Sequence, residues 1–133
     1  KIITGELPGH FIWRDDRAVA IMTIAPICPG HVLVIPKDEV DHWDDMSRDL
    51  AAHCLDVAQT IAKAIKSVYA CNRVSLQIVG LEVPHTHLHL VPINSMDDTS
   101  FARARQAEQD DLAREAERLR QALKAMGESS VAD

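Results

Sequence analysis

The chain has 133 residues and a mass of 14.7 kDa, which fits a single domain, so we predict one domain over residues 1–133. Hydrophobic residues make up 47% of the sequence and charged residues 26%, which excludes a disordered chain. The formal net charge of −6 argues against binding to a nucleic acid polymer, because such surfaces neutralise many phosphates with Lys and Arg.

Cysteine usage and hydropathy indicate the compartment. The three cysteines, Cys28, Cys54 and Cys71, form neither a C-x-x-C pair nor a zinc-finger spacing, so we expect a reducing, cytoplasmic environment. The most apolar stretch, residues 18–28, is too short for a membrane-spanning helix of about 20 residues. No signal peptide is visible, and we expect no contact with a membrane.

The first half of the chain predicts a hairpin, a strand and a long helix. Residues 11–23 carry two short apolar runs around a polar turn, which is typical of a β-hairpin. Residues 31–36 form a β-branched run bounded by Gly30 and Pro36, which predicts a buried strand. Ser47 precedes apolar residues at spacings of three and four, which predict an amphipathic helix over about residues 47–70.

The second half predicts two strands and a C-terminal helix. Residues 73–80 and 85–93 have the composition of strands. Residues 108–127 predict a helix that ends at a glycine and has a solvated charged face. Its apolar stripe consists of Leu112, Ala116, Leu119, Leu123 and Met126. Because the strands are mostly adjacent in sequence, we expect an α+β fold with an antiparallel sheet, one long central helix and a C-terminal helix.

Three of the seven histidines alternate along the last predicted strand, at His85, His87 and His89. Alternate side chains of a strand point to one face, so we expect the three imidazoles to line one face. Neutral imidazole is a base, a nucleophile and a metal ligand near neutral pH. One interpretation is therefore a metal site, with further ligands from His31, Glu39, His42 or Glu82. The other is covalent catalysis, in which the middle histidine attacks phosphorus.

The histidine string also carries a family resemblance. Residues 85–91, H-x-H-x-H followed by two apolar residues, resemble the signature of the histidine triad (HIT) family of nucleotide hydrolases and transferases. Residues 1–8 resemble the family's K-I-I-x-G-E-x-P start, and residues 29–37 its G-H-x-L-V-x-P-K strand. The resemblance covers about residues 1–93, while the C-terminal helix carries no motif. It implies a HIT-like fold, a nucleotide-binding enzyme and a homodimer in which two sheets run together.

The resemblance also assigns roles to the histidines. His87 matches the nucleophile that attacks the α-phosphorus of a purine nucleoside phosphoramidate, adenylate or dinucleoside polyphosphate. His89 and His31 match the histidines that flank this phosphate. The backbone carbonyl of His85 matches the acceptor that holds the Nδ1 proton of His87, so that Nε2 is free to attack. The transferase branch has Gln in place of the third motif histidine, so His89 favours hydrolysis of a P–N or P–O bond.

The substrate pocket is assigned by the same resemblance. The apolar slot for the base would involve Ile2, Ile21, Ile24 and Leu33. Thr23 stands where many relatives hold the ribose with an acidic residue, so we expect weak binding of AMP. Val83 keeps the frame of the family's G-Q-x-V-x-H, but Leu81 replaces the amide and Glu82 replaces a small polar residue. A carboxylate beside a phosphate is unfavourable, so we hypothesise that Glu82 protonates the leaving group or selects a cationic one.

Metal binding and catalytic competence remain to be distinguished. Many bacterial relatives bind a structural zinc through two N-terminal cysteines, a histidine after P-K and the first triad histidine. Glu39 occupies the position of that histidine here, so we expect no metal and no cofactor. Two alternatives to a hydrolase stay open. One is a nucleotide-binding module with little turnover, suggested by Thr23, Leu81 and Glu82, and the other is a metal-dependent protein that uses the histidine row.

Overall fold

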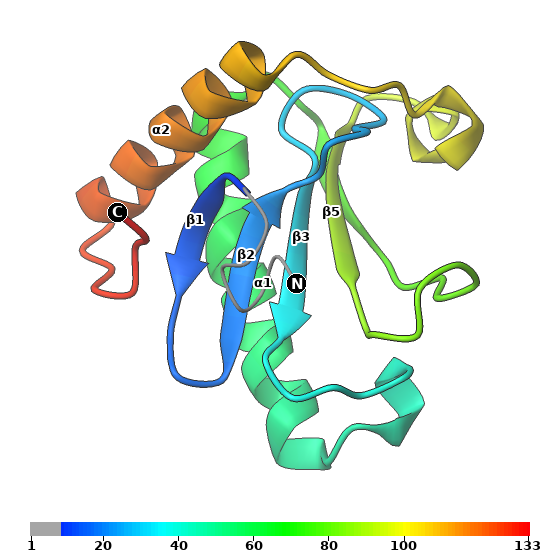
Figure 1. Ribbon diagram of the computed structural model, residues 1–133. Helices are drawn as coiled ribbons and strands as arrows, with labels where there is room; N and C mark the ends of the chain where they lie inside the picture. Colours follow the sequence, from blue (N-terminus) through cyan, green and yellow to red (C-terminus); the bar gives the residue numbers. More distant parts are fainter. Residues whose placement is uncertain (1–8) are drawn as a thin grey trace.

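A central antiparallel sheet organises the computed structural model, which describes residues 9–133. Within this range the sheet has five strands in the spatial order β1-β2-β3-β5-β4 (Figure 1). The strands are β1 (Phe11–Arg14), β2 (Ala18–Met22), β3 (Val32–Pro36), β4 (Arg73–Gln77) and β5 (Leu88–Ile93). The predicted α+β fold and the predicted hairpin are therefore confirmed. Two strand boundaries differ from the prediction, because β4 ends before residue 78 and β5 begins only at Leu88.

The turn of the hairpin is fixed by a single carboxylate. Asp15 accepts hydrogen bonds of 2.8 Å from the backbone N–H groups of Arg17 and Ala18 and from the indole of Trp13. His53, on the long helix, contacts the same carboxylate at 2.8 Å. Partial burial raises the pKa of Asp15, but these hydrogen bonds outweigh it and lower the pKa below its usual value.

The long helix α1 (Arg48–Val68) begins where the sequence predicts. The hydroxyl of Ser47 accepts the backbone N–H of Leu50 at 3.1 Å and caps the first turn. The residues at spacings of three and four point into the protein. The buried side chains of α1 are Leu50, Cys54, Val57, Ala58, Ile61, Ala64 and Ile65.

The C-terminal helix α2 (Gln109–Ala125) buries a stripe made of Leu112, Ala116, Leu119 and Leu123. Met126 was predicted to continue this stripe, and that prediction is wrong. Met126 is the C-cap residue and remains 40% exposed, because the chain leaves the helix there. Gly127 has a φ of 86°, and the backbone N–H of Glu128 donates to the carbonyl of Leu123 at 3.1 Å. This pair of features is a Schellman motif, which ends the helix.

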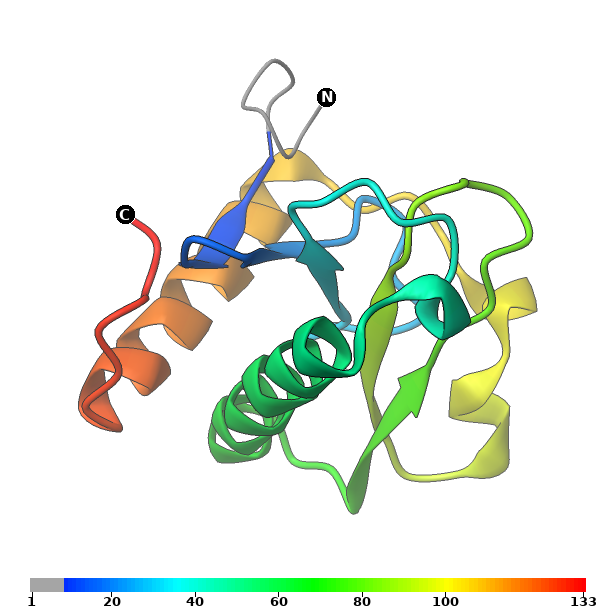
Figure 2. The same cartoon turned by 90° about the horizontal axis from the view of Figure 1, so that it is seen from below.

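The two helices lie on the same face of the sheet (Figures 1 and 2). Side chains alternate along each strand, so Val32, Val34, Leu88 and Leu90 join the helices in the main core. A small apolar cluster of Val19, Ile21 and Ile35 forms on the opposite face. Within residues 9–133, no helix has both the length and the apolarity needed to cross a membrane.

The two edges of the sheet differ. The last residues of the chain run antiparallel to β1, where Val131 bridges Trp13 and the backbone N–H of Ala132 donates to the carbonyl of Ile12 at 3.1 Å. At the other edge, β4 pairs only with β5 among the strands that the structure describes. The sheet therefore has one covered edge and one open edge.

Candidate functional site

The site forms where β3 and β5 lie side by side. Leu33 of β3 pairs directly with His89 of β5, and Gln77 of β4 pairs with His89 on its other side. Because alternate residues share a face, both Leu33 and His89 point away from the helices. The only triad histidine inside a strand is His89, since His85 and His87 lie in the extended segment before β5. The predicted sharing of one face still extends along this segment, because Thr86 and Leu88 are buried on the other side.

His31 and His89 form a hydrogen-bonded pair with a defined direction. The Nδ1 atom of His31 accepts the backbone N–H of Ile27 at 3.0 Å, so this nitrogen carries no proton. The proton of neutral His31 is therefore on Nε2, which lies 3.0 Å from Nδ1 of His89 and donates to it. His89 accepts on Nδ1, so its own proton is on Nε2. The pair thus presents His89 as a hydrogen-bond donor through Nε2.

Burial keeps this pair uncharged at neutral pH. His31 is only 1% exposed, and desolvation together with the neighbouring His89 lowers its pKa to about 3. Desolvation and the neighbouring His87 lower the pKa of His89 to about 4. A protonated imidazole on either residue would lose its acceptor nitrogen and break the chain of hydrogen bonds.

The two residues that precede His87 are anchored by hydrogen bonds. The ring of His85 donates from Nε2 to the carbonyl of Pro36 at 2.8 Å. The backbone N–H and the hydroxyl of Thr86 both donate to the carbonyl of Val40, at 2.8 and 3.0 Å. These three bonds fasten residues 85 and 86 to the end of β3 and to the chain that follows it. His87 is thereby held with little freedom of its backbone.

His87 is neutral and has one nitrogen available. Desolvation and the neighbouring His85 lower its pKa, while a hydrogen bond to the backbone of His85 raises it, and the net effect is a pKa below the usual value. A neutral imidazole carries one N–H and one lone pair, so one ring nitrogen of His87 is free to act as a nucleophile or acceptor. The role predicted for the carbonyl of His85 is consistent with this bond.

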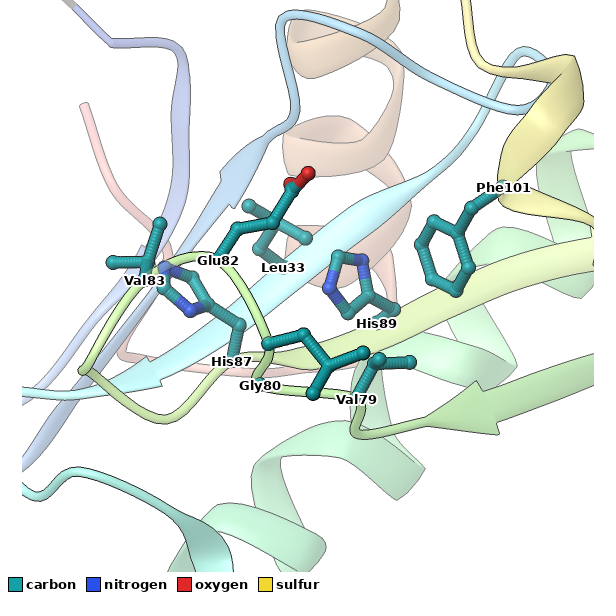
Figure 3. Close-up of a pocket in the computed structure, with 9 residues that line it drawn as sticks. Leu33, Val79, Gly80, Glu82, Val83, His87, His89 and Phe101 are labelled. Carbon is teal, nitrogen blue, oxygen red and sulfur yellow. The ribbon is translucent and has the colours of Figure 1, made fainter.

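His87 and His89 both line a pocket of about 360 Å³, a volume in the range of small-molecule sites. Figure 3 shows His87 and His89 directed into the same space, with Leu33 behind them and the ring of Phe101 beyond His89. The residues lining the pocket are Leu33, Val79, Gly80, Leu81, Glu82, Val83, His87, His89 and Phe101. Apart from Glu82 and the histidines, this lining is apolar.

The pocket brings together only some of the residues predicted to form the site. Leu33, Glu82, Val83, His87 and His89 line it. Two of the other predicted residues support the site from outside the pocket, since His85 bonds the carbonyl of Pro36 and His31 bonds His89. The remaining three lie elsewhere: Ile21 is in the small apolar cluster, Ile24 is 53% exposed, and Thr23 accepts the backbone N–H of Ala25. Ile2 lies outside the described residues.

Phe101 lines the pocket but was not predicted from the sequence. It lies on a short 3-10 helix, η3 (Phe101–Arg103), and its ring meets His89 edge-on with centroids 4.9 Å apart. The ring of His31 is 6.3 Å away. Phe101 follows the family motifs and belongs to no periodic segment, so the sequence offers no local signal for it. Val79 and Leu81 were also not predicted to bind substrate, although Leu81 departs from the family pattern.

No metal centre is apparent in the described part of the chain. Among residues 9–133, no three His, Cys, Asp or Glu side chains are grouped so that they would hold a metal ion. Of the side chains considered for that role, His31 spends both ring nitrogens on Ile27 and His89. His85 uses Nε2 for the carbonyl of Pro36. In His85 and His89, one ring nitrogen each is thus engaged in a hydrogen bond within the protein.

Comparison with known proteins agrees with this geometry. The sequence profile of the HIT domain matches residues 4–96. The chain belongs to the HIT family. A HIT-like protein of unknown function from Borreliella burgdorferi is 33% identical over 110 residues, which are 77% of this chain and 79% of that protein.

Two HIT relatives have enzyme names. The adenosine 5'-monophosphoramidase of Saccharomyces cerevisiae is 31% identical over 93 residues, covering 69% of this chain and 59% of the yeast enzyme. The asymmetrical bis(5'-nucleosyl)-tetraphosphatase of Schizosaccharomyces pombe is 28% identical over 94 residues, covering 67% of this chain and 52% of that enzyme. Nucleotide hydrolases are therefore among the relatives of this HIT protein.

Solved HIT structures share the fold over almost the whole chain. A HIT-like protein from Bartonella henselae, described as involved in cell-cycle regulation, superposes with a TM-score of 0.81 at 27% identity and covers 92% of both chains. A zinc-bound histidine triad protein from Mycobacterium smegmatis also gives a TM-score of 0.81, at 29% identity, and covers 95% of this chain and 91% of that chain. The similarity extends beyond residue 96, so it includes the C-terminal helix.

Proposed function

We propose that this HIT protein hydrolyses a P–N or P–O bond of a purine nucleoside phosphoramidate, adenylate or dinucleoside polyphosphate. The observation that carries the proposal is the pairing, in one pocket, of a neutral His87 with a neutral His89 whose Nε2 donates a hydrogen bond. The two relatives with enzyme names, a phosphoramidase and a tetraphosphatase, support the choice of bond.

The first step forms a covalent nucleotidyl-histidine. The free lone pair of His87 attacks the α-phosphorus and the new N–P bond forms. The bond from phosphorus to the leaving group breaks with its electron pair on the leaving group, and a departing amine takes up a proton from solvent. Positive charge develops on the imidazole of His87 during the attack. The hydrogen bond to the backbone of His85 stabilises this charge, which is why it raises the pKa of His87. His89 donates to the phosphate oxygens as their negative charge redistributes.

The second step regenerates the enzyme. Water attacks phosphorus, the N–P bond breaks with its electron pair on His87, and a nucleoside monophosphate leaves together with the proton of the water. The apolar lining around Leu33, Val79 and Phe101 limits competing water in the pocket. Leu33 and Val83 are proposed contacts of the nucleotide, and Ile2, Ile21, Thr23 and Ile24 remain proposed contacts of the base and ribose.

Glu82 is proposed to act on the leaving group. Its side chain is exposed and lines the same pocket as His87 and His89. A carboxylate there would repel the phosphate but attract a leaving group with an amine, such as the side chain of lysine. Glu82→Gln should therefore lose the preference for a lysine phosphoramidate over an uncharged alkyl phosphoramidate. Glu39→Gln, which removes an exposed carboxylate outside the pocket, is the matched control; equal preferences in both variants would reject the role.

The decisive experiment compares release of AMP from adenosine lysine phosphoramidate by the wild type and by His87→Ala. Loss of an activated nucleophile typically lowers the rate by about three orders of magnitude or more. His53→Gln, which removes a histidine on the helix side of the sheet, should retain activity. Intact-protein mass spectrometry after a rapid alkaline quench, under which a P–N bond to imidazole persists, should show an adenylyl adduct in the wild type only. Equal AMP release by the wild type and His87→Ala would refute the mechanism.

A second candidate is a nucleotide-binding module without useful turnover. It is favoured by the pocket mouth, where Leu81 is 89% exposed and a carboxylate, Glu82, faces the region proposed for phosphate. Calorimetry distinguishes the two candidates. Tight binding of AMP with no AMP release from any phosphoramidate or polyphosphate would favour the module. Loss of activity in EDTA would instead favour a metal-dependent reaction.

The assembly and the compartment are also proposed. The open edge of β4 and the 43% exposed Leu76 on that strand favour a homodimer in which the two sheets become continuous. Light scattering after size exclusion tests this state, and Leu76→Lys should shift it toward the monomer. All three cysteines are free, which is consistent with the proposed cytoplasmic location.

A further inference from the structure

The loop that precedes β3 is held from outside by the C-terminal part of the chain. This loop, residues 23–31, ends in His31. The backbone N–H of Ala107 donates to the carbonyl of Ile24 at 3.0 Å, and that of Arg105 donates to the carbonyl of Pro26 at 3.1 Å. Both donors come from the segment that leads into α2, which carries none of the sequence motifs. A part of the chain without motifs therefore shapes the surroundings of a motif histidine.

A third contact is made by a carboxylate on α2 itself. Oε1 of Glu115 accepts the backbone N–H of Gly30 at 2.9 Å and the hydroxyl of Tyr69 at 3.4 Å. Gly30 is buried and has a φ of 94°. A Cβ atom at this position would lie 2.8 Å from the ring of Tyr69. Gly30 is thus fixed between an aromatic ring and a carboxylate, directly before His31.

The position of Gly30 controls the hydrogen bonds of His31. His31 donates its backbone N–H to the carbonyl of Cys28 at 3.3 Å and accepts the N–H of Ile27 on Nδ1 at 3.0 Å. Both partners lie in the loop that Glu115 fastens. If the loop shifts and the bond from Ile27 is lost, His31 is free to carry its proton on Nδ1. Its Nε2 would then accept a hydrogen bond from the Nδ1–H of His89, and Nε2 of His89 would become an acceptor.

We infer that Glu115 is a positioning residue for the phosphate site: by holding the Gly30 N–H it selects the His31 tautomer that makes Nε2 of His89 a donor. The consequence for turnover rests on the proposed function, because only a bound phosphate needs that donor. The consequence for the tautomers does not rest on the proposed function, because it concerns the protein without a nucleotide. Glu115 lies on the helix face of the sheet and reaches the site only through the loop.

The test measures the tautomers first. In the free protein, ¹⁵N chemical shifts of the imidazoles should show His31 protonated on Nε2 and unprotonated on Nδ1. In Glu115→Ala, the shifts of both His31 nitrogens should move toward a mixture of the two tautomers. Glu115→Gln keeps an oxygen that can accept from Gly30, so it should restore the wild-type pattern. If Glu115→Ala does not fold, Glu115→Asp, which draws the carboxylate back by one methylene, should shift the tautomers in the same direction.

The rate is the second readout. Glu115→Ala should lower kcat for the phosphoramidate by about tenfold or more, with a smaller change in KM, because the lost donor acts on the transition state. Glu115→Gln should recover most of this loss. Leu123→Ala is the control for destabilisation, since it weakens α2 two turns further along and makes no contact with the loop; it should leave kcat and the tautomers unchanged.

The outcomes are distinguishable. Unchanged shifts and an unchanged kcat in Glu115→Ala would overturn the inference, and so would the same tautomer mixture in Leu123→Ala. If the wild type hydrolyses no nucleotide while Glu115→Ala still mixes the tautomers, the proposed function fails and the positioning role stands.

Discussion

Acid should destabilise this protein because His31 is buried as a neutral imidazole. The unfolded chain has a histidine pKa of about 6.5, whereas the pKa of His31 in the fold is about 3. The unfolded state therefore binds a proton below pH 6.5 that the folded state does not bind, and stability is lost as the pH falls from 6.5 toward 3. Between pH 7 and pH 5, the unequal proton uptake at this one residue costs about 2 kcal/mol of unfolding free energy. His89, whose pKa in the fold is about 4, adds a loss of the same sign and of similar size over this pH range.

Urea denaturation at pH 7 and pH 5 measures this difference in unfolding free energy. The protein concentration is kept the same in all samples, because the stability of a dimer depends on concentration. His31→Asn removes the titrating group and keeps a side-chain oxygen that can accept the N–H of Ile27. The wild type should lose about 2 kcal/mol more than His31→Asn between pH 7 and pH 5. Equal losses in the two proteins would show that His31 is not buried as a neutral imidazole.

Three further perturbations test the packing. Phe101→Ala removes the ring 4.9 Å from His89 and should raise KM for the nucleotide about threefold to tenfold; an unchanged KM in steady-state kinetics would exclude Phe101 from the pocket wall. Ser47→Ala deletes the cap of α1 and should lower the unfolding free energy by about 1 kcal/mol in urea, with activity retained. Leu119→Ala leaves a cavity under α2 and should cost about 3 kcal/mol; a cost below 1 kcal/mol would mean that the stripe is not core.

The parts of the fold that follow from local pattern could be predicted from the sequence. Ser47 and the apolar spacing after it predict α1 almost to the residue, because capping and amphipathicity act within one element. The alternation of His85, His87 and His89 predicts correctly that they share a side of the chain. Their placement within a strand was wrong for the first two, since His85 and Thr86 bond the last residue of β3 and the chain after it instead of forming ladder bonds.

The parts that depend on contacts between distant segments could not be predicted. Phe101 reaches His89 because the chain turns back through two short 3-10 helices after β5, and no periodicity records that turn. Glu115 looks like one more charged residue on a solvated helix until Gly30 and Tyr69 are seen beside it. The family resemblance places Ile21 and Ile24 in the apolar slot for the base, but it does not show that Ile21 packs in the small cluster or that Ile24 is exposed.

The covered edge of the sheet limits how copies of this chain can stack. The residues around Val131 already occupy the backbone groups beside β1, so another strand has no partner there. Among the strands of residues 9–133, β4 is the one that leaves an edge for strand addition. In the proposed homodimer, two copies that meet there would use up each other's free edge, so the pairing would terminate itself instead of growing into a filament.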